Sequence, residues 1–225
     1  LRILSRLAGV GPHNRSRRAY LHRLTEALGT PMPERYLRWI SIWDRPSEIL
    51  VSRLSGFARQ GLVNPDIKKI WQDAKGSGLL GQILELNFRE YLGNDLLVKV
   101  DRCTMAHGLE ARCPFLDQDL FEFCASLPSS YHFRGLGGKR LLRAACADLL
   151  PPKIRSRRKM GFGIPLGSWF RGPWRAPLET ALRSPDALLY EYFDRQKCHK
   201  LLAEHLEGRS DHGMRLWLLV TTEIW

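Results

Sequence analysis

The sequence predicts a mainly all-α chain. Apolar residues recur at helical spacing along most of its 225 residues, short Gly- and Pro-containing breaks separate these stretches, and no segment sustains an alternation of apolar and polar residues. The hydrophobic share is 44%, with seven Trp and nine Phe, which supports a packed core and excludes a disordered chain. No apolar run approaches the roughly 18 residues that would suggest a membrane span.

The first 93 residues predict five helices. Capping residues and prolines that precede stretches of helical period mark where each one begins. The first helix is expected over residues 16–28 and ends at Gly29. Gly93 is expected to end the fifth helix near Leu92. The second to fifth helices are expected to start near Pro33, Ser47, Asn64 and Leu79.

Four more helices are expected after Gly93. Asp117 is placed to cap a helix that continues to about Leu127. A glycine-rich turn at 135–138 leads into a helix from Lys139 to about Leu149, and two prolines then end it. The last two helices are expected to begin near Asp194 and Asp211.

The chain is strongly basic, with 35 Lys and Arg against 23 Asp and Glu and a net charge of +12. Such a charge attracts phosphate, whether in a nucleotide or in a nucleic acid. The basic residues are spread along the chain, however, with clusters only at 15–18 and 153–159. The net charge alone therefore does not identify the binding partner.

The cysteine pattern indicates reduced thiols. There are five, an odd number, and no pair has CxxC spacing, so neither a disulfide framework nor a zinc site is expected. We interpret them as small apolar side chains in the interior. They are Cys103, Cys113, Cys124, Cys146 and Cys198.

Two segments carry candidate chemistry. From Asp101 to Asp117, acids and bases alternate among apolar residues, which predicts a buried network of paired charges. For Glu110 and Arg112 a purely structural salt bridge is the alternative. The second segment is a glycine-flanked loop around Lys159, whose compact ammonium suits phosphate oxygens. A solvated basic turn is the alternative there.

Three ordered motifs resemble a known family. The strings LLVKVDRCTMAHGLEARCPFLD, GGKRLLRAACADLLPPKI and RRKMGFGIPLGSWFRG resemble the C-terminal half of the synthetase domain of glutamine-hydrolysing asparagine synthetases, most strongly over 94–172. The resemblance implies that residues 1–225 form one partial domain, the helical C-terminal portion of a larger α/β synthetase domain of the ATP-pyrophosphatase type. It also implies a cytoplasmic ligase of asparagine biosynthesis.

The resemblance assigns roles to individual residues. Lys159 matches the family's catalytic lysine, which contacts the ATP phosphates and stabilises the departing pyrophosphate. Lys99 and Asp95 match positions near the substrate and the phosphates. Residues that support the pocket wall or shape the Lys159 loop would be Asp101, Arg102, Glu110, Arg112, Asp117, Gly161, Phe162 and Gly163.

The resemblance further implies partners that act in the full enzyme. These are ATP, Mg²⁺, aspartate, ammonia released from glutamine and the N-terminal half of the same protein; a homodimer is compatible with it. The glutaminase domain, the SGGxDS pyrophosphate loop and the acidic magnesium segment do not occur in the sequence, which begins at Leu1 rather than Met. No residue of this chain is assigned to a metal. We therefore expect a fragment that is inactive by itself.

Other functional classes remain open. A relative that amidates another carboxylate would carry the same motifs. A basic helical nucleic-acid-binding module would present a positive face with exposed aromatic rings, although nucleic acid is not the partner that the resemblance implies. A non-catalytic scaffold is the third alternative.

Overall fold

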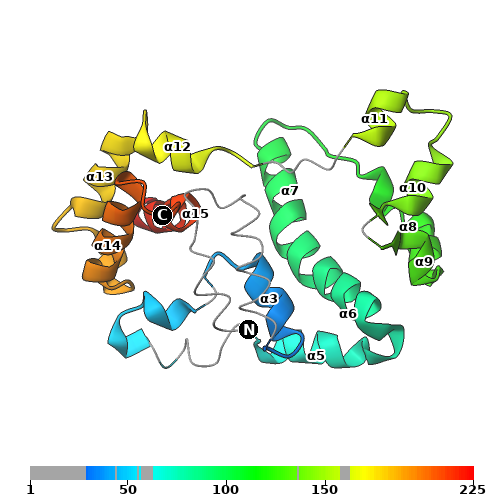
Figure 1. Cartoon of the computed structure of the whole chain (residues 1–225), viewed down its shortest axis with the longest axis horizontal. Helices are drawn as coiled ribbons and strands as arrows, with labels where there is room; N and C mark the ends of the chain where they lie inside the picture. The colour runs from blue at the N-terminus through cyan, green and yellow to red at the C-terminus, as the bar shows by residue number, and fades with distance from the viewer. Residues whose placement is uncertain (1–28, 44, 55, 57–62, 136, 158–162) are drawn as a thin grey trace. The chain divides into compact units, whose positions relative to one another are not determined.

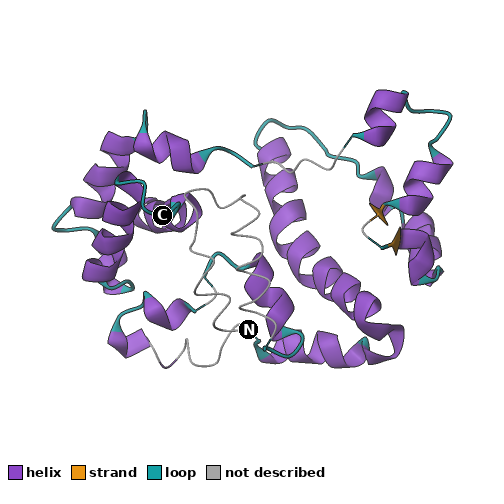
Figure 2. Ribbon diagram, in the orientation of Figure 1, coloured by secondary structure: helices purple, strands orange, loops and turns teal. Residues whose placement is uncertain are grey.

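The computed structural model describes residues 29–225 except 44, 55, 57–62, 136 and 158–162. It divides into two compact units, Leu1–Lys68 with Gly163–Trp225 as unit 1 and Lys69–Phe162 as unit 2. Both are mainly helical, which confirms the predicted all-α character (Figures 1 and 2). None of the helices in the described part of the chain combines the length and the apolar character that a membrane span requires.

The predictions for the first helices have mixed outcomes. Helix α3 (Glu34–Ile40) confirms the helix expected from Pro33, and the helix expected over 16–28 lies outside the described residues. The helix expected from Ser47 is wrong, because short 3-10 turns η1 (Pro46–Glu48) and η2 (Ser52–Leu54) replace it. The backbone between them pairs instead with a distant segment: Val51 N–H donates to the Tyr192 carbonyl at 3.0 Å.

The core of unit 1 comes mainly from its C-terminal part. Two helices there, α12 (Leu166–Arg171) and α13 (Arg175–Arg183), were not predicted. The turn η6 (Leu188–Glu191) follows, and the two predicted final helices are confirmed as α14 (Arg195–Leu206) and α15 (Gly213–Ile224). The core consists of Ile49, Leu166, Phe170, Leu178, Leu182, Ala187, Leu189, Cys198, Leu202, Leu216 and Leu219.

Two glycines allow α12 and α15 to pack closely. A methyl group added at Gly213 would lie 2.8 Å from the backbone nitrogen of Gly167. One added at Gly167 would lie 2.6 Å from a carboxylate oxygen of Asp211. A side chain at Gly213 would therefore separate the helices, and one at Gly167 would displace the Asp211 carboxylate.

A long helix crosses unit 2. Helix α5 (Pro65–Asp73) begins where the sequence predicts, with Asn64 Oδ1 accepting a hydrogen bond from Ile67 N–H at 2.8 Å. After η3 (Lys75–Ser77), helical structure continues unbroken through α6 (Gly78–Leu86), the π-helix η4 (Asn87–Leu97) and α7 (Val98–Met105). The predicted end at Gly93 is wrong, because Gly93 keeps a negative φ inside the π-helix.

Gly108 is the residue that terminates this helix. Its φ is 66°, in the left-handed region that favours glycine. Gly108 N–H donates to the Met105 carbonyl, and Leu109 N–H donates to the Thr104 carbonyl, both at 3.0 Å. This pair of bonds is a Schellman motif.

The cap predicted at Asp117 is confirmed. After η5 (Pro114–Leu116), the Asp117 carboxylate accepts from Leu120 N–H at 3.1 Å and starts α8 (Gln118–Ser126). The rings of Phe88 and Phe121, 4.5 Å apart, stack η4 against α8.

The remainder of unit 2 is a chain of short elements. They are α9 (Ser129–His132), a hairpin of β1 (Phe133–Arg134) and β2 (Gly137–Gly138), α10 (Arg140–Ala145) and α11 (Pro152–Ser156). The hairpin supplies the predicted turn. Helix α10 ends at Ala145, four residues before the expected Leu149. Pro152 is the first residue of α11, so it begins a helix in addition to following the end of the one before it.

Unit 2 buries little apolar surface. Among its described residues Leu86, 1% exposed, is the only large apolar side chain that is fully buried. Its exposed large apolar residues are Leu79, Leu84, Phe88, Tyr91, Val98, Val100, Met105, Leu109, Phe115, Leu120, Phe123, Tyr131, Phe133, Leu142, Leu149, Leu150 and Ile154. An apolar surface of this extent is typical of an interface.

Candidate functional site

The residues predicted to face substrate and phosphate lie on the long helix of unit 2. Asp95 is in the last turns of η4, and Lys99 and Arg102 are in α7. All three side chains are exposed. Among the described residues, none of them is hydrogen-bonded or ion-paired through its side chain.

Lys99 and Arg102 form a pair of available cations. They are three residues apart in a regular α-helix, so they lie on the same side of it. Because no described carboxylate neutralises them, both can donate to an anionic ligand. Asp95 has a less direct relation to them, because it lies in the π-helix, where the α-helical spacing does not apply.

The buried charge network predicted from Asp101 to Asp117 is wrong in this structure. Glu110 and Arg112 do form an ion pair of 3.0 Å, but their side chains are 70% and 83% exposed. Asp101, Arg102 and Asp117 are exposed as well, and Asp117 serves as a helix cap. These charged side chains stay in contact with water because unit 2 has only a small apolar core. An exposed ion pair such as Glu110–Arg112 contributes at most about 1 kcal/mol to the free energy of unfolding.

The catalytic assignment falls outside the described residues. Lys159, Gly161 and Phe162 lie in 158–162, and Gly163 is an exposed residue just before α12. That Lys99 and Lys159 both lie near the ATP phosphates, as the resemblance implies, therefore stays a prediction.

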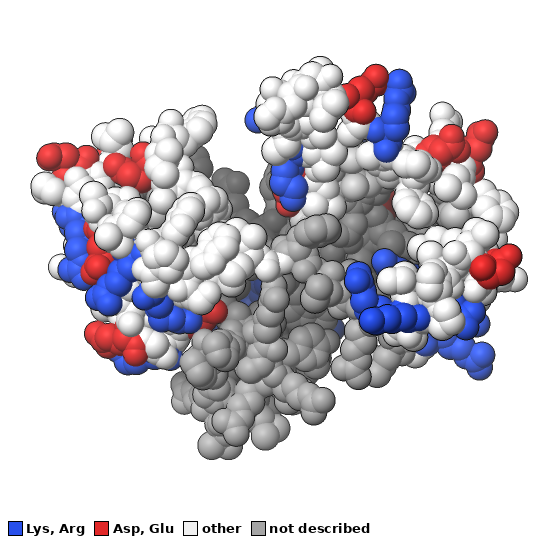
Figure 3. All heavy atoms as spheres, turned by 90° about the horizontal axis from the view of Figure 1, so that it is seen from above, with Lys and Arg blue, Asp and Glu red and all other residues white. Residues whose placement is uncertain are grey.

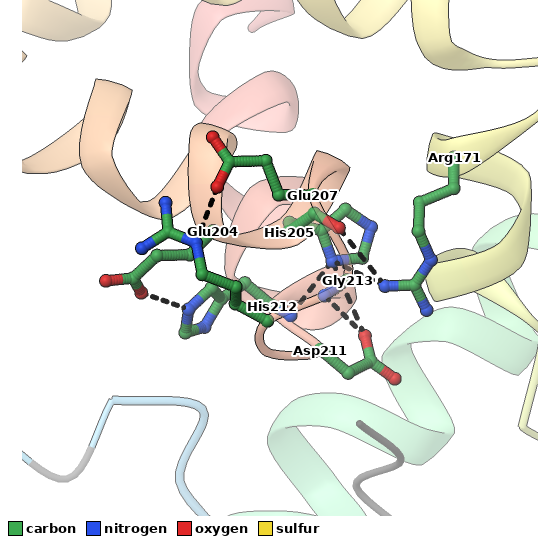
Figure 4. A network of polar contacts seen from close by, with 8 residues as sticks. Arg171, Glu204, His205, Glu207, Asp211, His212 and Gly213 are labelled. Carbon is green, nitrogen blue, oxygen red and sulfur yellow. Dashed lines mark hydrogen bonds and ion pairs between the residues drawn. The ribbon is translucent and has the colours of Figure 1, made fainter. Parts of the chain in front are cut away.

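A buried polar cluster in unit 1 has no counterpart in the sequence predictions (Figure 4). His205, near the end of α14, has no exposed surface. Its Nδ1 accepts a hydrogen bond from His212 N–H at 3.1 Å, and Arg171 donates to its carbonyl at 3.3 Å. His212 Nε2 lies 2.9 Å from the Glu204 carboxylate, and Gly213 N–H donates to Asp211 at 3.0 Å.

These contacts keep the His205 imidazole neutral. Because Nδ1 accepts a hydrogen bond, the ring proton belongs on Nε2. Burial, followed by the nearby Arg171 guanidinium, lowers the pKa of His205. Burial also lowers the pKa of His212, although its hydrogen bond to Glu204 opposes this shift. A fully buried ring does not reach a substrate, so the cluster holds the turn between α14 and α15.

The sequence does contain a signal for this cluster. Cys198, Leu202 and His205 follow each other at spacings of four and three, so His205 lies on the apolar face of its helix. Gly208, with a φ of 73°, then turns the chain back toward α15. A histidine on such a face is a candidate for burial.

The cysteine predictions are partly right. All five thiols are free. Cys198 is buried, and desolvation raises its pKa to about 12. Cys103 and Cys113 are exposed, so the interpretation of all five as interior side chains is wrong for these two.

Among the described residues, no group of three or more His, Cys, Asp or Glu is arranged to hold a metal ion.

Comparison with known proteins gives a consistent set of relatives. A sequence profile of the family described as asparagine synthase matches residues 6–225. The chain is 24% identical over its whole length to asparagine synthetase (glutamine-hydrolyzing) 1 of Bacillus subtilis strain 168 and covers 34% of that protein.

Two further relatives extend this set. A putative asparagine synthetase (glutamine-hydrolyzing) of Mycobacterium tuberculosis H37Rv is 29% identical over 91% of the chain, again with 34% of that protein covered. The asparagine synthetase of Gallus gallus is 33% identical over 54% of the chain and 24% of its own length. The chain thus spans about a third of the first two relatives. No solved structure matches it.

Proposed function

Because the chain belongs to the asparagine synthase family, we propose that it forms the C-terminal part of the synthetase domain of an ATP-dependent, glutamine-hydrolysing asparagine synthetase. The observation that carries the proposal is the match over residues 6–225 to a family whose curated members are about three times as long. A cytoplasmic location and the ATP-pyrophosphatase type of fold are parts of the same proposal.

The proposed reaction has two steps. ATP transfers AMP to the side-chain carboxylate of aspartate, and pyrophosphate leaves. Ammonia, released from glutamine elsewhere in the protein, then attacks the activated carbonyl carbon and displaces AMP, which yields asparagine. Mg²⁺ would neutralise phosphate charge, with ligands from the rest of the protein.

This chain would contribute fixed cations to the first step. Negative charge accumulates on the β- and γ-phosphates as the bond to the α-phosphate breaks. Lys159 is proposed to face these oxygens, and Lys99 the remaining phosphates or the substrate. A fixed cation that meets developing charge commonly lowers the barrier by about 3 kcal/mol. Asp95 is proposed to lie beside the substrate.

The apolar surface of unit 2 supports the proposal that the chain is one part of a larger domain. Much of this surface would be covered by the preceding half of the protein, with the rings of Tyr131 and Phe133 left exposed. The chain alone is therefore expected to self-associate, to bind ATP weakly and in a salt-sensitive way, and to release no pyrophosphate. A monodisperse chain with one sharp melting transition would contradict this expectation.

The test is reconstitution with the preceding half, joined covalently or supplied in trans. We expect pyrophosphate release that requires ATP, aspartate and ammonia. Lys159→Ala should then reduce kcat roughly 100-fold, in line with the loss of one transition-state contact. Lys197→Ala, an exposed lysine of α14 that lies 3.9 Å from Asp194, is the control and should leave kcat unchanged.

Two results would contradict the proposal. An unchanged kcat for Lys159→Ala would remove the catalytic assignment. A panel of carboxylates in place of aspartate addresses the substrate, because turnover of another carboxylate with aspartate inert would identify a relative of different specificity.

A further inference from the structure

The stretch from α9 to α11 concentrates positive charge. Residues 129–157 contain seven basic side chains and a single carboxylate, Asp148, whereas the whole chain has 35 basic and 23 acidic residues. All seven are exposed. We call this set the basic surface, and it consists of Arg134, Lys139, Arg140, Arg143, Lys153, Arg155 and Arg157.

Hydrogen bonds from arginine side chains to backbone carbonyls join the elements that carry the basic surface. The Arg140 guanidinium at the start of α10 donates to the Ser130 carbonyl in α9. Arg155 in α11 donates to the Ala147 carbonyl, just after α10, at 3.0 Å. In Figure 3, Lys and Arg side chains lie on both sides of the view, and those on the right lie on the side where α8–α11 are drawn in Figure 1.

The cations of the basic surface have no acidic partners among the described residues. Unit 1 offers a contrast, because Arg175 and Arg183 both pair with Glu179, at 3.1 and 3.2 Å. Unpaired like charges on neighbouring elements repel each other, and an external polyanion relieves that repulsion. The described residues of this chain therefore leave the positive charge of the basic surface without neutralising carboxylates.

Two aromatic rings lie within the same stretch. Tyr131 in α9 is 51% exposed, and Phe133 in β1 is 43% exposed. Exposed rings beside arginines provide stacking faces for unpaired bases, which bind with little dependence on sequence. Five of the seven cations are arginines, whose planar guanidinium binds phosphate with two parallel hydrogen bonds.

We propose that the basic surface binds single-stranded nucleic acid, with its cations on the phosphates and with Tyr131 and Phe133 stacked on bases. The proposal goes beyond the synthetase reaction and does not depend on it. An acidic polypeptide would satisfy the charges, whereas single-stranded nucleic acid would engage both the charges and the exposed rings.

The experiment measures binding of the 225-residue chain to a labelled 15-nucleotide single strand, as RNA and as DNA, by fluorescence anisotropy between 50 and 200 mM NaCl. Log Kd should change linearly with log salt. Each phosphate contact contributes a slope of about 0.7. The triple variant Arg134→Ser, Arg143→Ser, Lys153→Ser should therefore lower the slope by about 2. A triple variant of unit 1, Arg175→Ser, Arg183→Ser, Lys197→Ser, is the matched control and should keep the slope.

The aromatic contribution is tested separately. Tyr131→Ala with Phe133→Ala should weaken binding roughly 30-fold or more without altering the salt slope. A duplex of the same length should bind more weakly, because its base faces are hidden. Circular dichroism spectra like those of the wild type should accompany each variant.

Three results would overturn the proposal. The first is the absence of measurable binding at 50 mM NaCl. The second is an equal loss of slope in the unit 1 control, which would indicate diffuse attraction by net charge. The third is displacement by polyglutamate of matched charge as effective as displacement by unlabelled nucleic acid, because this would assign the surface to an acidic protein.

Discussion

The Nδ1 atom of His205 accepts a hydrogen bond of 3.1 Å from the backbone N–H of His212, and this bond joins the end of α14 to the start of α15. Protonation of Nδ1 would break the bond and would place a second cation beside Arg171. The neutral ring is therefore part of the packing of unit 1.

Stability should fall in mild acid. The pKa values of His205 and His212 are lowered in the folded state, while both residues titrate near their ordinary value of about 6.5 when unfolded. Their contribution to the free energy of unfolding is thus fully present above about pH 6.5 and is lost as the pH falls below it. Urea denaturation at pH 7.5, 6.5 and 5.5 measures this loss.

His205→Gln should flatten that pH dependence by up to about 1.4 kcal/mol per pH unit, the slope for one proton. The variant starts from a lower stability at pH 7.5, since it loses a buried ring. His107→Gln, on an exposed residue of unit 2, is the control and should leave the slope unchanged. An equal slope in wild type and His205→Gln would argue against this role.

Gly213→Ala should destabilise the protein by about 1–3 kcal/mol, because the new methyl group would lie 2.8 Å from the Gly167 nitrogen and would separate α12 from α15. Gly76→Ala provides the comparison, since nothing lies within 4 Å of a methyl group added there. The midpoint of urea denaturation should fall for the first variant only. Equal midpoints would show that the helices can separate at little cost.

Two glycines of the long helix should respond to alanine with opposite signs. Gly108→Ala forces a side chain into the left-handed region and should cost about 1–2 kcal/mol. Gly93→Ala places a better helix former inside η4, with only an ordinary contact of 3.9 Å to the Phe88 carbonyl oxygen, and should stabilise by up to about 1 kcal/mol. Denaturation curves monitored by helical circular dichroism distinguish the two. A shift of the same sign in both would contradict the assignment of Gly108 as the cap.

The five thiols should differ in reactivity. Cys198 is buried with its pKa raised to about 12, so it carries almost no thiolate at pH 8. Exposed Cys103 and Cys113 should react with a chromogenic disulfide reagent in the native protein, and Cys198 only after urea is added. Cys198→Ala should leave the fast native phase intact. Loss of that phase in the variant would mean that Cys198 is accessible.

Local signals were the part of the fold that could be predicted from sequence. Asn64, Asp117 and Asp194 each accept a hydrogen bond from a backbone N–H three residues later. Such caps depend on a few neighbouring residues, so their patterns are reliable. Gly93 and Gly108 show the limit, because Gly93 keeps a negative φ and stays within the helix whereas Gly108 takes a positive φ and ends it, and composition does not reveal that angle.

Burial was the part that could not be predicted. The alternation of charges from Asp101 to Asp117 indicates either a buried network or a solvated surface, and the choice depends on distant segments that pack against it. Glu110 and Arg112 pair in the open because unit 2 has little core of its own. His205 shows the opposite case: it is a polar residue whose burial was not predicted, and it is completely buried.

Charge distribution also required the fold. The basic cluster at 153–159 was visible in the sequence, but Arg134, Lys139, Arg140 and Arg143 were read as part of a diffuse excess. The hydrogen bonds that link α9, α10 and α11 bring these residues into one region. The candidate site could not be checked in the same way. Its predicted catalytic residue, Lys159, lies outside the described residues, so that assignment stays a prediction.

The π-helix η4 lets the long helix tolerate a change in length. A π-helical stretch accommodates residues in excess of the α-helical count, so a homologue that lacks one residue between Asn87 and Leu97 closes the gap as ordinary α-helix. In a continuous α-helix the same deletion would turn everything after it by about 100°, the angle of one residue. Here the excess residue is the one removed, so Lys99 and Arg102 would keep their side of the helix. Single-residue deletions in this stretch would thus leave the direction of these two cations unchanged.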